Sequence, residues 1–206
     1  MILEIIQIFL LFILPVLLVY YKIIPFKYRR QTLVTVSIIT LILLIYERWS
    51  LKDLGIRLDN FIPSLIPYVI FTTLGIILLY IVAKVIKRKP IANFYSNKKY
   101  IIIIVLGSIL QEFLYRGFLY PKLNAIFSSY VIIILVNAVL FTLMHTIYSN
   151  TPTTLITVFI AGLAFTGIYA CYPNLILISI SHIILTQIAV RYNFYKEEKK
   201  TIRNPG

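Results

Sequence analysis

Four ionisable side chains stand inside apolar stretches of this sequence: Glu112, Arg116, His145 and His182. A charge at the centre of a membrane helix costs about 2.5–3.5 kcal/mol on insertion scales, so such residues usually mark a function. One carboxylate and two imidazoles are also groups that activate water. The carboxylate can act as base, and neutral imidazoles can bind a metal ion or donate hydrogen bonds. We therefore take Glu112, His145 and His182 as candidate catalytic residues and candidate metal ligands.

Packing explains each of these residues when it is taken alone. Glu112 and Arg116 stand at i and i+4, so on a helix they share a face and can form a purely structural ion pair. A single buried histidine is more often a hydrogen-bonded packing residue than a ligand. Other polar residues of the apolar stretches are expected only to bond neighbouring helices: Asn137, Thr142 and Ser181. Only the convergence of the carboxylate with both imidazoles favours a site over packing.

Composition indicates which elements must position these residues. The chain has 206 residues, of which 60% are hydrophobic and 13% charged, and its mean hydropathy is +0.92. Soluble domains are about 45–50% apolar and about 25% charged. The sequence therefore predicts an all-α, polytopic integral membrane protein. The first apolar run precedes its basic residues, the reverse of a cleavable signal peptide, so we expect it to remain as a membrane helix.

Seven apolar segments are candidates for membrane-spanning helices, since a span takes about 20 residues. They cover 3–21, 32–47, 62–86, 100–119, 129–148, 153–171 and 174–192. The predicted organisation has three parts: N-terminal helices with a surface segment (1–99), a catalytic-type core from helices four to seven (100–193), and a polar tail (194–206). Within the first part, Ser50–Asn60 mixes leucine with charges and is expected to lie along the membrane surface.

The net charge of +13 is distributed as in a membrane protein rather than in a nucleic-acid-binding protein. Most of the 20 Lys and Arg residues fall in the first loop, the third loop and the tail, which share one side of the membrane. The positive-inside rule then places the C-terminus in the cytoplasm and the N-terminus outside. A bacterial plasma membrane is the expected location.

The three candidate catalytic residues are predicted to reach one level of the membrane. Equal depth for Glu112 and His145 on consecutive helices requires a turn near position 128, where two serines interrupt the apolar pattern. His182, well inside the last segment, reaches a similar level at 1.5 Å per residue. This geometry also predicts that Lys122 and Asn124 project beyond the outer surface.

The same residues form three short motifs in order along the chain. They read "QEFLYR" (Gln111–Arg116), "FTLMH" (Phe141–His145) and "HIILT" (His182–Thr186). This arrangement resembles the CPBP intramembrane metalloproteases, which include type II CAAX prenyl endopeptidases and bacteriocin-processing or immunity proteins. The family pattern is EExxxR, FxxxH and HxxxN on successive helices, and the resemblance covers about 100–190. "LKDLGI" (Leu51–Ile56) also resembles a segment found upstream in bacterial members.

The resemblance implies hydrolysis of a peptide bond within the membrane. It implies that Glu112 and His145 orient the water, that His182 and Thr186 stabilise the oxyanion, and that Arg116 holds Glu112. It also implies zinc as a cofactor, with His145, His182 and Glu112 as its ligands. The expected partners are the lipid bilayer and a membrane-embedded or membrane-associated peptide or protein substrate, not nucleic acid.

Two positions depart from the family pattern. Gln111 stands where the family has its first glutamate, and a neutral amide cannot take a proton from water. Either Glu112 is the base, although neighbouring residues on a helix point about 100° apart, or the protein binds a membrane peptide without cleaving it, as an immunity or scaffold protein. Thr186 replaces asparagine, and its hydroxyl can still donate one hydrogen bond to an oxyanion. A proton relay in a transporter is a third alternative, disfavoured because no inverted repeat is evident.

Overall fold

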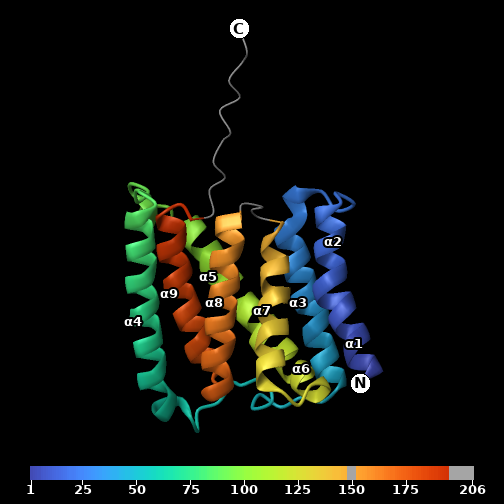
Figure 1. Ribbon diagram of the computed structural model, residues 1–206. Helices are drawn as coiled ribbons and strands as arrows, with labels where there is room; N and C mark the ends of the chain where they lie inside the picture. Colours follow the sequence, from blue (N-terminus) through green and yellow to red (C-terminus); the bar gives the residue numbers. More distant parts are fainter. Residues whose placement is uncertain (148–151, 195–206) are drawn as a thin grey trace.

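The computed structural model describes residues 1–147 and 152–194, and this part of the chain is a bundle of helices without strands (Figure 1). Two long helical segments contain a π-helical stretch. The first joins α1 (Ile2–Ile8), η1 (Phe9–Ile13) and α2 (Leu14–Tyr20), and the second joins α5 (Lys98–Glu112), η4 (Phe113–Leu119) and α6 (Tyr120–Ile126). The other long helices are α3 (Arg29–Tyr46), α4 (Phe61–Val85), α7 (Tyr130–His145), α8 (Pro152–Cys171) and α9 (Leu175–Arg191). Short 3-10 turns, η2 (Phe26–Tyr28) and η3 (Phe94–Ser96), lie in the loops.

Each of the seven predicted spans corresponds to one helical segment, so the predicted fold class is confirmed. Among the described residues, five helices are long and apolar enough to cross a membrane: Ile2–Tyr20, Phe26–Tyr46, Phe61–Val85, Lys98–Ile126 and Thr154–Cys171. The helices α7 and α9 are apolar but shorter. The protein is therefore an integral membrane protein.

The loops gather at two opposite ends of the bundle (Figure 1). The loop between α2 and α3, the loop between α4 and α5 and the end of α9 lie at the upper end in this view. The N-terminus, the loop between α3 and α4 and the turn between α6 and α7 lie at the lower end. The basic loops that the sequence assigns to one side therefore do share one end of the bundle.

Each π-helical stretch is followed closely by a proline. Pro15 comes two residues after η1 ends at Ile13, and Pro121 comes two residues after η4 ends at Leu119. Proline lacks an N–H, and its ring collides with the carbonyl four residues earlier, so a wider turn just before it relieves the collision. In the second case the wide turn falls directly after Glu112.

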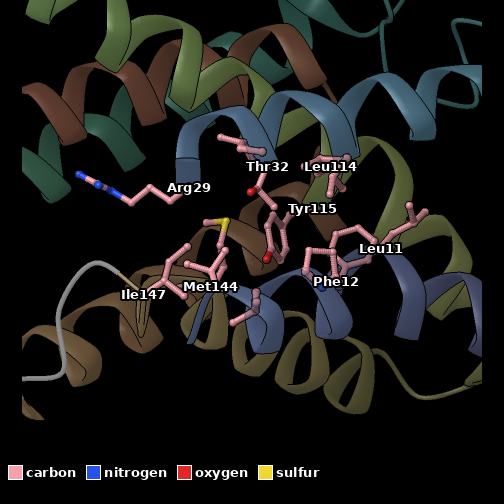
Figure 2. Close-up of a pocket in the computed structure, with 13 residues that line it drawn as sticks. Leu11, Phe12, Arg29, Thr32, Leu114, Tyr115, Met144 and Ile147 are labelled. Atoms are coloured by element: carbon pink, nitrogen blue, oxygen red, sulfur yellow. The ribbon is translucent and has the colours of Figure 1, made fainter. Parts of the chain in front are cut away.

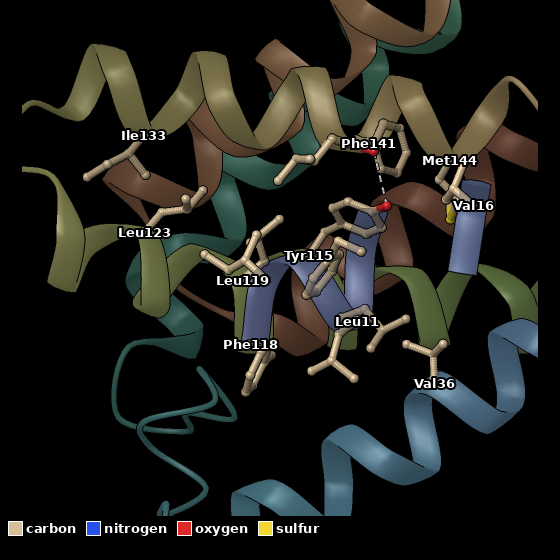
Figure 3. Packing of buried hydrophobic residues seen from close by; sticks show 14 of the residues in the cluster. Leu11, Val16, Val36, Tyr115, Phe118, Leu119, Leu123, Ile133, Phe141 and Met144 are labelled. Carbon is tan, nitrogen blue, oxygen red and sulfur yellow. Dashed lines mark hydrogen bonds between the residues drawn. The ribbon is translucent and has the colours of Figure 1, made fainter. Parts of the chain in front are cut away.

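The main apolar core lies where η4 packs against α1–α2, α3 and α7 (Figure 3). Phe118 and Leu119 are fully buried there. The Tyr115 hydroxyl donates a hydrogen bond of 3.2 Å to the Leu140 carbonyl on α7, which is drawn as a dashed line. Beside this core is a largely apolar cavity of about 40 Å³, lined in part by Tyr115 and Met144 (Figure 2). A space of that size holds a few waters at most.

The segment Ser50–Asn60, which the sequence predicts to lie along the membrane surface, packs against one end of the bundle. Leu54 is buried in the main core, and the Leu175 amide at the start of α9 donates to the Gly55 carbonyl at 2.7 Å. The buried Asn174 side chain donates to the Arg57 carbonyl at 2.8 Å. The segment is therefore docked onto the α8–α9 end of the bundle, because its backbone groups find partners there.

Lys122 is also buried instead of projecting from the surface. Its ammonium contacts Glu47 Oε2 at 2.6 Å, and Gln7 and Trp49 donate to the same carboxylate. Partial burial by itself raises the pKa of the Glu47 carboxyl, but these hydrogen bonds, led by that of Lys122, outweigh burial and hold the pKa below its ordinary value. This cluster ties α1, the end of α3 and α6 together at the lower end of the bundle. Asn124 is exposed as predicted.

Substitution of Gly55 by alanine is expected to destabilise the protein by about 2–3 kcal/mol. Gly55 has φ +77, and a Cβ there would lie 2.1 Å from the Tyr169 hydroxyl; a side chain at such a φ costs about 1–3 kcal/mol before any collision. Gly167→Ala is the matched control, because a Cβ there meets nothing within 4 Å. Unfolding midpoints in detergent should fall for Gly55→Ala alone, and equal midpoints would contradict this account of the loop.

Candidate active site

Glu112 and Arg116 form a fully buried ion pair at the junction of α5 and η4. Both side chains are 0% exposed, and Arg116 Nη1 lies 3.2 Å from Glu112 Oε1. The Arg116 guanidinium also lies over the Phe141 ring, 4.9 Å from its centroid. A buried charge is tolerated only when it is paired, so each of the two residues requires the other.

His182 on α9 completes this cluster from the opposite side. Its Nδ1 lies 2.5 Å from the same Glu112 oxygen, Oε1. An ionised carboxylate only accepts hydrogen bonds, so Nδ1 carries the proton and Nε2 is the nitrogen left to accept one. The predicted convergence of Glu112 with His182 is therefore present as a direct contact.

The second oxygen of Glu112, Oε2, is buried and has no hydrogen-bond partner among the described residues. Oε1 therefore accepts from both the arginine and the histidine. Because the carboxylate is fully buried and engaged in this way, it does not face a substrate directly. Its effect on any reaction must pass through His182.

Four of the predicted site residues line one cavity of about 610 Å³. They come from three helices: Gln111 from α5, His145 from α7, and His182 and Thr186 from α9. Glu112 and Arg116 do not line this cavity. Gln111 thus points to the cavity, whereas Glu112 points to the buried ion pair. The two differ because adjacent residues are rotated by about 100° about the helix axis.

His145 is the last residue of α7 and is held by its own helix. Its Nδ1 lies 2.8 Å from the Phe141 carbonyl, which can only accept, so Nδ1 carries the proton here too. The Phe141 ring centroid lies 4.6 Å from that of His145 and 6.0 Å from that of His182. Both imidazoles are therefore set with Nε2 as their proton acceptor.

A second cavity, of about 440 Å³, lies between α4, α8 and α9 and is mostly apolar. It shares His182 and Thr186 with the first cavity. The face of α9 that carries these two residues therefore borders both cavities.

The predicted zinc ligands do not fit a zinc ion in this arrangement. No group of three His, Cys, Asp or Glu side chains is placed to hold a metal ion within 1–147 and 152–194. Protein zinc sites take at least three such ligands. Glu112 and His182 are instead bonded to each other, and His145 lies against its own helix.

Two buried residues beside the site, Asn137 and Thr166, have partners that the sequence does not reveal. Asn137 donates to the Tyr115 carbonyl in η4 at 2.9 Å, across to a neighbouring helix as predicted for a packing residue. Thr166 lies on α8 and accepts from Arg116 Nη2 at 3.3 Å. By contrast, the Thr142 hydroxyl bonds the Ala138 carbonyl of its own helix, and among the described residues it bonds no neighbouring helix. In the sequence, the only signal for Asn137 and Thr166 is that each is a polar residue within an apolar segment.

Comparison with known families gives one match. Residues 96–187 match the family described as type II CAAX prenyl endopeptidase Rce1-like. This match supports an assignment of that part of the chain to the CPBP family. No curated protein and no solved structure matches the chain.

All three motifs lie within the segment that matches this CPBP family model. Four of the positions that define the family pattern line the cavity: Gln111, His145, His182 and Thr186. At the first motif glutamate this chain presents Gln111, so the only motif carboxylate, Glu112, lies behind the cavity wall. The motif residues at the cavity therefore offer two imidazoles, an amide and a hydroxyl.

Removal of the Arg116 charge alone is expected to lower the free energy of unfolding more than removal of both the Arg116 and the Glu112 charges. Arg116→Gln leaves the Glu112 carboxylate buried without its cation and should lower the free energy of unfolding by about 3–5 kcal/mol. The double variant Glu112→Gln, Arg116→Gln carries no buried charge and should recover part of that loss. Unfolding in mixed detergent and SDS measures both, and a double variant less stable than the single one would contradict the pairing.

Proposed function

We propose that this protein is an intramembrane endopeptidase in which His182, held by Glu112, activates the hydrolytic water. The observation that carries the proposal is the 2.5 Å contact between His182 Nδ1 and Glu112 Oε1 at the wall of a cavity that His145 also lines. The match of residues 96–187 to the type II CAAX prenyl endopeptidase Rce1-like family, which is a protease family, supports the reaction class.

His182 is better suited than His145 to take a proton. An imidazole that accepts a proton becomes a cation, and a carboxylate bonded to its other nitrogen stabilises that cation. His182 has such a carboxylate in Glu112, whereas the Nδ1 of His145 faces the neutral Phe141 carbonyl. Glu112 thus contributes to the base through His182, and not by contact with the water as the sequence suggests.

Gln111 and Thr186 are suited to hold the oxyanion. A side-chain amide donates hydrogen bonds through its NH₂ group, and a threonine hydroxyl donates one. Both residues line the cavity together with His182. Donors aimed at the developing negative charge stabilise a tetrahedral intermediate. In this proposal Gln111 is an oxyanion donor, a role for which it needs no ionisable proton.

The proton movements follow from these assignments. Water attacks the scissile carbonyl carbon while one of its protons passes to His182 Nε2. His145 Nε2 accepts a hydrogen bond from the other hydrogen of the water and so orients it. The oxyanion accepts hydrogen bonds from Gln111 and Thr186. His182 then returns the proton to the leaving nitrogen as the carbon–nitrogen bond breaks. The products are a carboxylic acid and an amine, and His182 is neutral again.

The proposed location is a bacterial plasma membrane, with the N-terminus outside and the C-terminus in the cytoplasm. The basic loops at one end of the bundle support this orientation through the positive-inside rule. Arg29 and Arg30 line the same cavity as the histidines, so the cavity reaches toward this basic end. The substrate would meet the site from the cytoplasmic side of the membrane.

Loss of the Glu112 carboxylate is expected to reduce cleavage of quenched membrane peptides by about 10²–10⁴-fold, the usual contribution of an acid–base group. His182→Ala and His145→Ala should lower the rate as well, and a chelator should leave the wild-type rate unchanged. Asp59→Asn is the control, since it removes a carboxylate from an exposed ion pair in the loop between α3 and α4. Full activity of Glu112→Gln would reject the proposed base, and a chelator-sensitive rate would require a metal ion.

Peptide binding without cleavage is the second candidate function, and Gln111 is the observation that favours it. A motif glutamate would stand at the cavity wall where this chain has an amide. The same peptide panel separates the two functions if binding is recorded beside cleavage. Cleavage by Gln111→Glu alone, with binding by the wild type, would identify a binding protein that has lost its base.

Peptides with an acidic residue near the scissile bond should be preferred over their amide counterparts by about fivefold, equivalent to ~1 kcal/mol. Arg29 and Arg30 line the cavity, and no acidic side chain of the described residues does. Arg30→Gln should reduce the preference, whereas Lys99→Gln, at the same end of the bundle but not in the cavity lining, should retain it. If both substitutions reduced the preference equally, the preference would come from the overall positive charge at that end of the bundle and not from the cavity lining.

A further inference from the structure

A chain of buried polar side chains leads from the site into α7 and α8, away from the cavity. Arg116 Nη2 donates to Thr166 Oγ1 at 3.3 Å and to the Gly162 carbonyl at 3.4 Å, both on α8. Thr166 Oγ1 lies 2.7 Å from the Gly162 carbonyl and 3.1 Å from Asn137 Oδ1 on α7. Arg116, Thr166 and Asn137 are all 0% exposed.

The orientation of the Asn137 amide follows from its partners. Its Nδ2 donates to the Tyr115 carbonyl, which can only accept, so Oδ1 is the atom that faces Thr166. The chain of contacts therefore begins and ends in η4, next to Glu112. It links η4 to α7 and α8 with the arginine at one end and the tyrosine carbonyl at the other.

From these contacts we infer that Thr166 is a positioning residue: its hydroxyl holds Arg116, and through Arg116 the Glu112–His182 pair. This role rests on the function proposed above. Neither Thr166 nor Asn137 lines the cavity that contains the histidines, so neither contacts the substrate. Thr166 is the one of the two that bonds Arg116 directly, so its effect on the reaction is expected to pass through Arg116.

The Thr166 hydroxyl matters because the buried guanidinium has few acceptors. Arg116 Nε already has no hydrogen-bond partner among the described residues. Without the hydroxyl, Nη2 keeps only the 3.4 Å contact with the Gly162 carbonyl. A buried donor that loses its acceptor moves to find another, and movement of Arg116 loosens its contact with Glu112 Oε1. The His182 ring then loses the fixed carboxylate that selects its tautomer.

The test is ¹⁵N NMR of histidine-labelled protein in detergent micelles. The chain has 2 histidines, so the spectrum contains two rings, assigned with His145→Gln. In the wild type, His182 should show a single tautomer with the proton on Nδ1. Thr166→Val, which keeps the side-chain volume and removes the hydroxyl, should give exchange between tautomers at His182. His145 should be unchanged, because its Nδ1 partner is a backbone carbonyl on its own helix.

Two further substitutions separate positioning from general damage. Thr166→Ser restores the hydroxyl and should return the wild-type spectrum of His182. Thr142→Val removes a hydroxyl whose hydrogen-bond partner among the described residues is the Ala138 carbonyl of its own helix, and should change neither ring. In the cleavage assay, Thr166→Val should lower kcat by about 10- to 100-fold with KM unchanged, the scale of a small misplacement of reacting groups.

An unchanged His182 spectrum in Thr166→Val would overturn the inference, as would equal changes in both histidines. The same holds if Thr166→Ser fails to restore the wild-type spectrum. The spectrum does not depend on activity. If no variant cleaves any peptide but the His182 tautomer still responds to Thr166, hydrolysis is rejected while the hold of Thr166 on the pair stands.

Discussion

The buried charge of Glu112 is the constraint on which the rest of the site depends. A carboxylate that is 0% exposed needs a cation, and Arg116 supplies it from the next turn of the same helical segment. The guanidinium in turn needs acceptors, which α8 supplies as the Thr166 hydroxyl and the Gly162 carbonyl. α8 can approach closely because a Cβ at Gly162 would lie 3.1 Å from Ala138 Cα on α7. The close contact between α7 and α8 thus helps to bring the acceptors on α8 to the Arg116 guanidinium.

The π-helical stretch η4 sets the direction from which these partners come. Its wide turn begins directly after Glu112, and Pro121, just beyond it, supplies the steric reason for it. The Tyr115 carbonyl within η4 accepts the Tyr120 amide as well as the Asn137 side chain. A side chain from α7 therefore stabilises the irregular turn that carries Arg116. Backbone irregularity in a membrane helix persists only where such neighbours satisfy it.

The sequence predicts the helices and their order well, because the length and hydropathy of each segment are local properties. The turn near position 128 and the shared face of Glu112 and Arg116 are also found as predicted. The partners are less predictable, since they depend on how helices rotate about their axes. Periodicity alone does not show that Glu112 bonds His182 and not His145, that Thr166 reaches Arg116, or that Lys122 turns inward to Glu47. The docking of Leu54 and Gly55 likewise depends on backbone partners supplied by α9.

The amide at position 111 is consistent with the charge balance of this site. The described residues around Glu112 provide one buried cation, Arg116, for one buried carboxylate. A second carboxylate at the adjacent position would add a like charge in a region of low dielectric, where repulsion is strong and a second cation would be needed. With a neutral Gln111, the cavity wall carries donors and acceptors but no acidic charge. In the proposed reaction the base is then an imidazole, and His182, which lines the cavity, is bonded to a carboxylate.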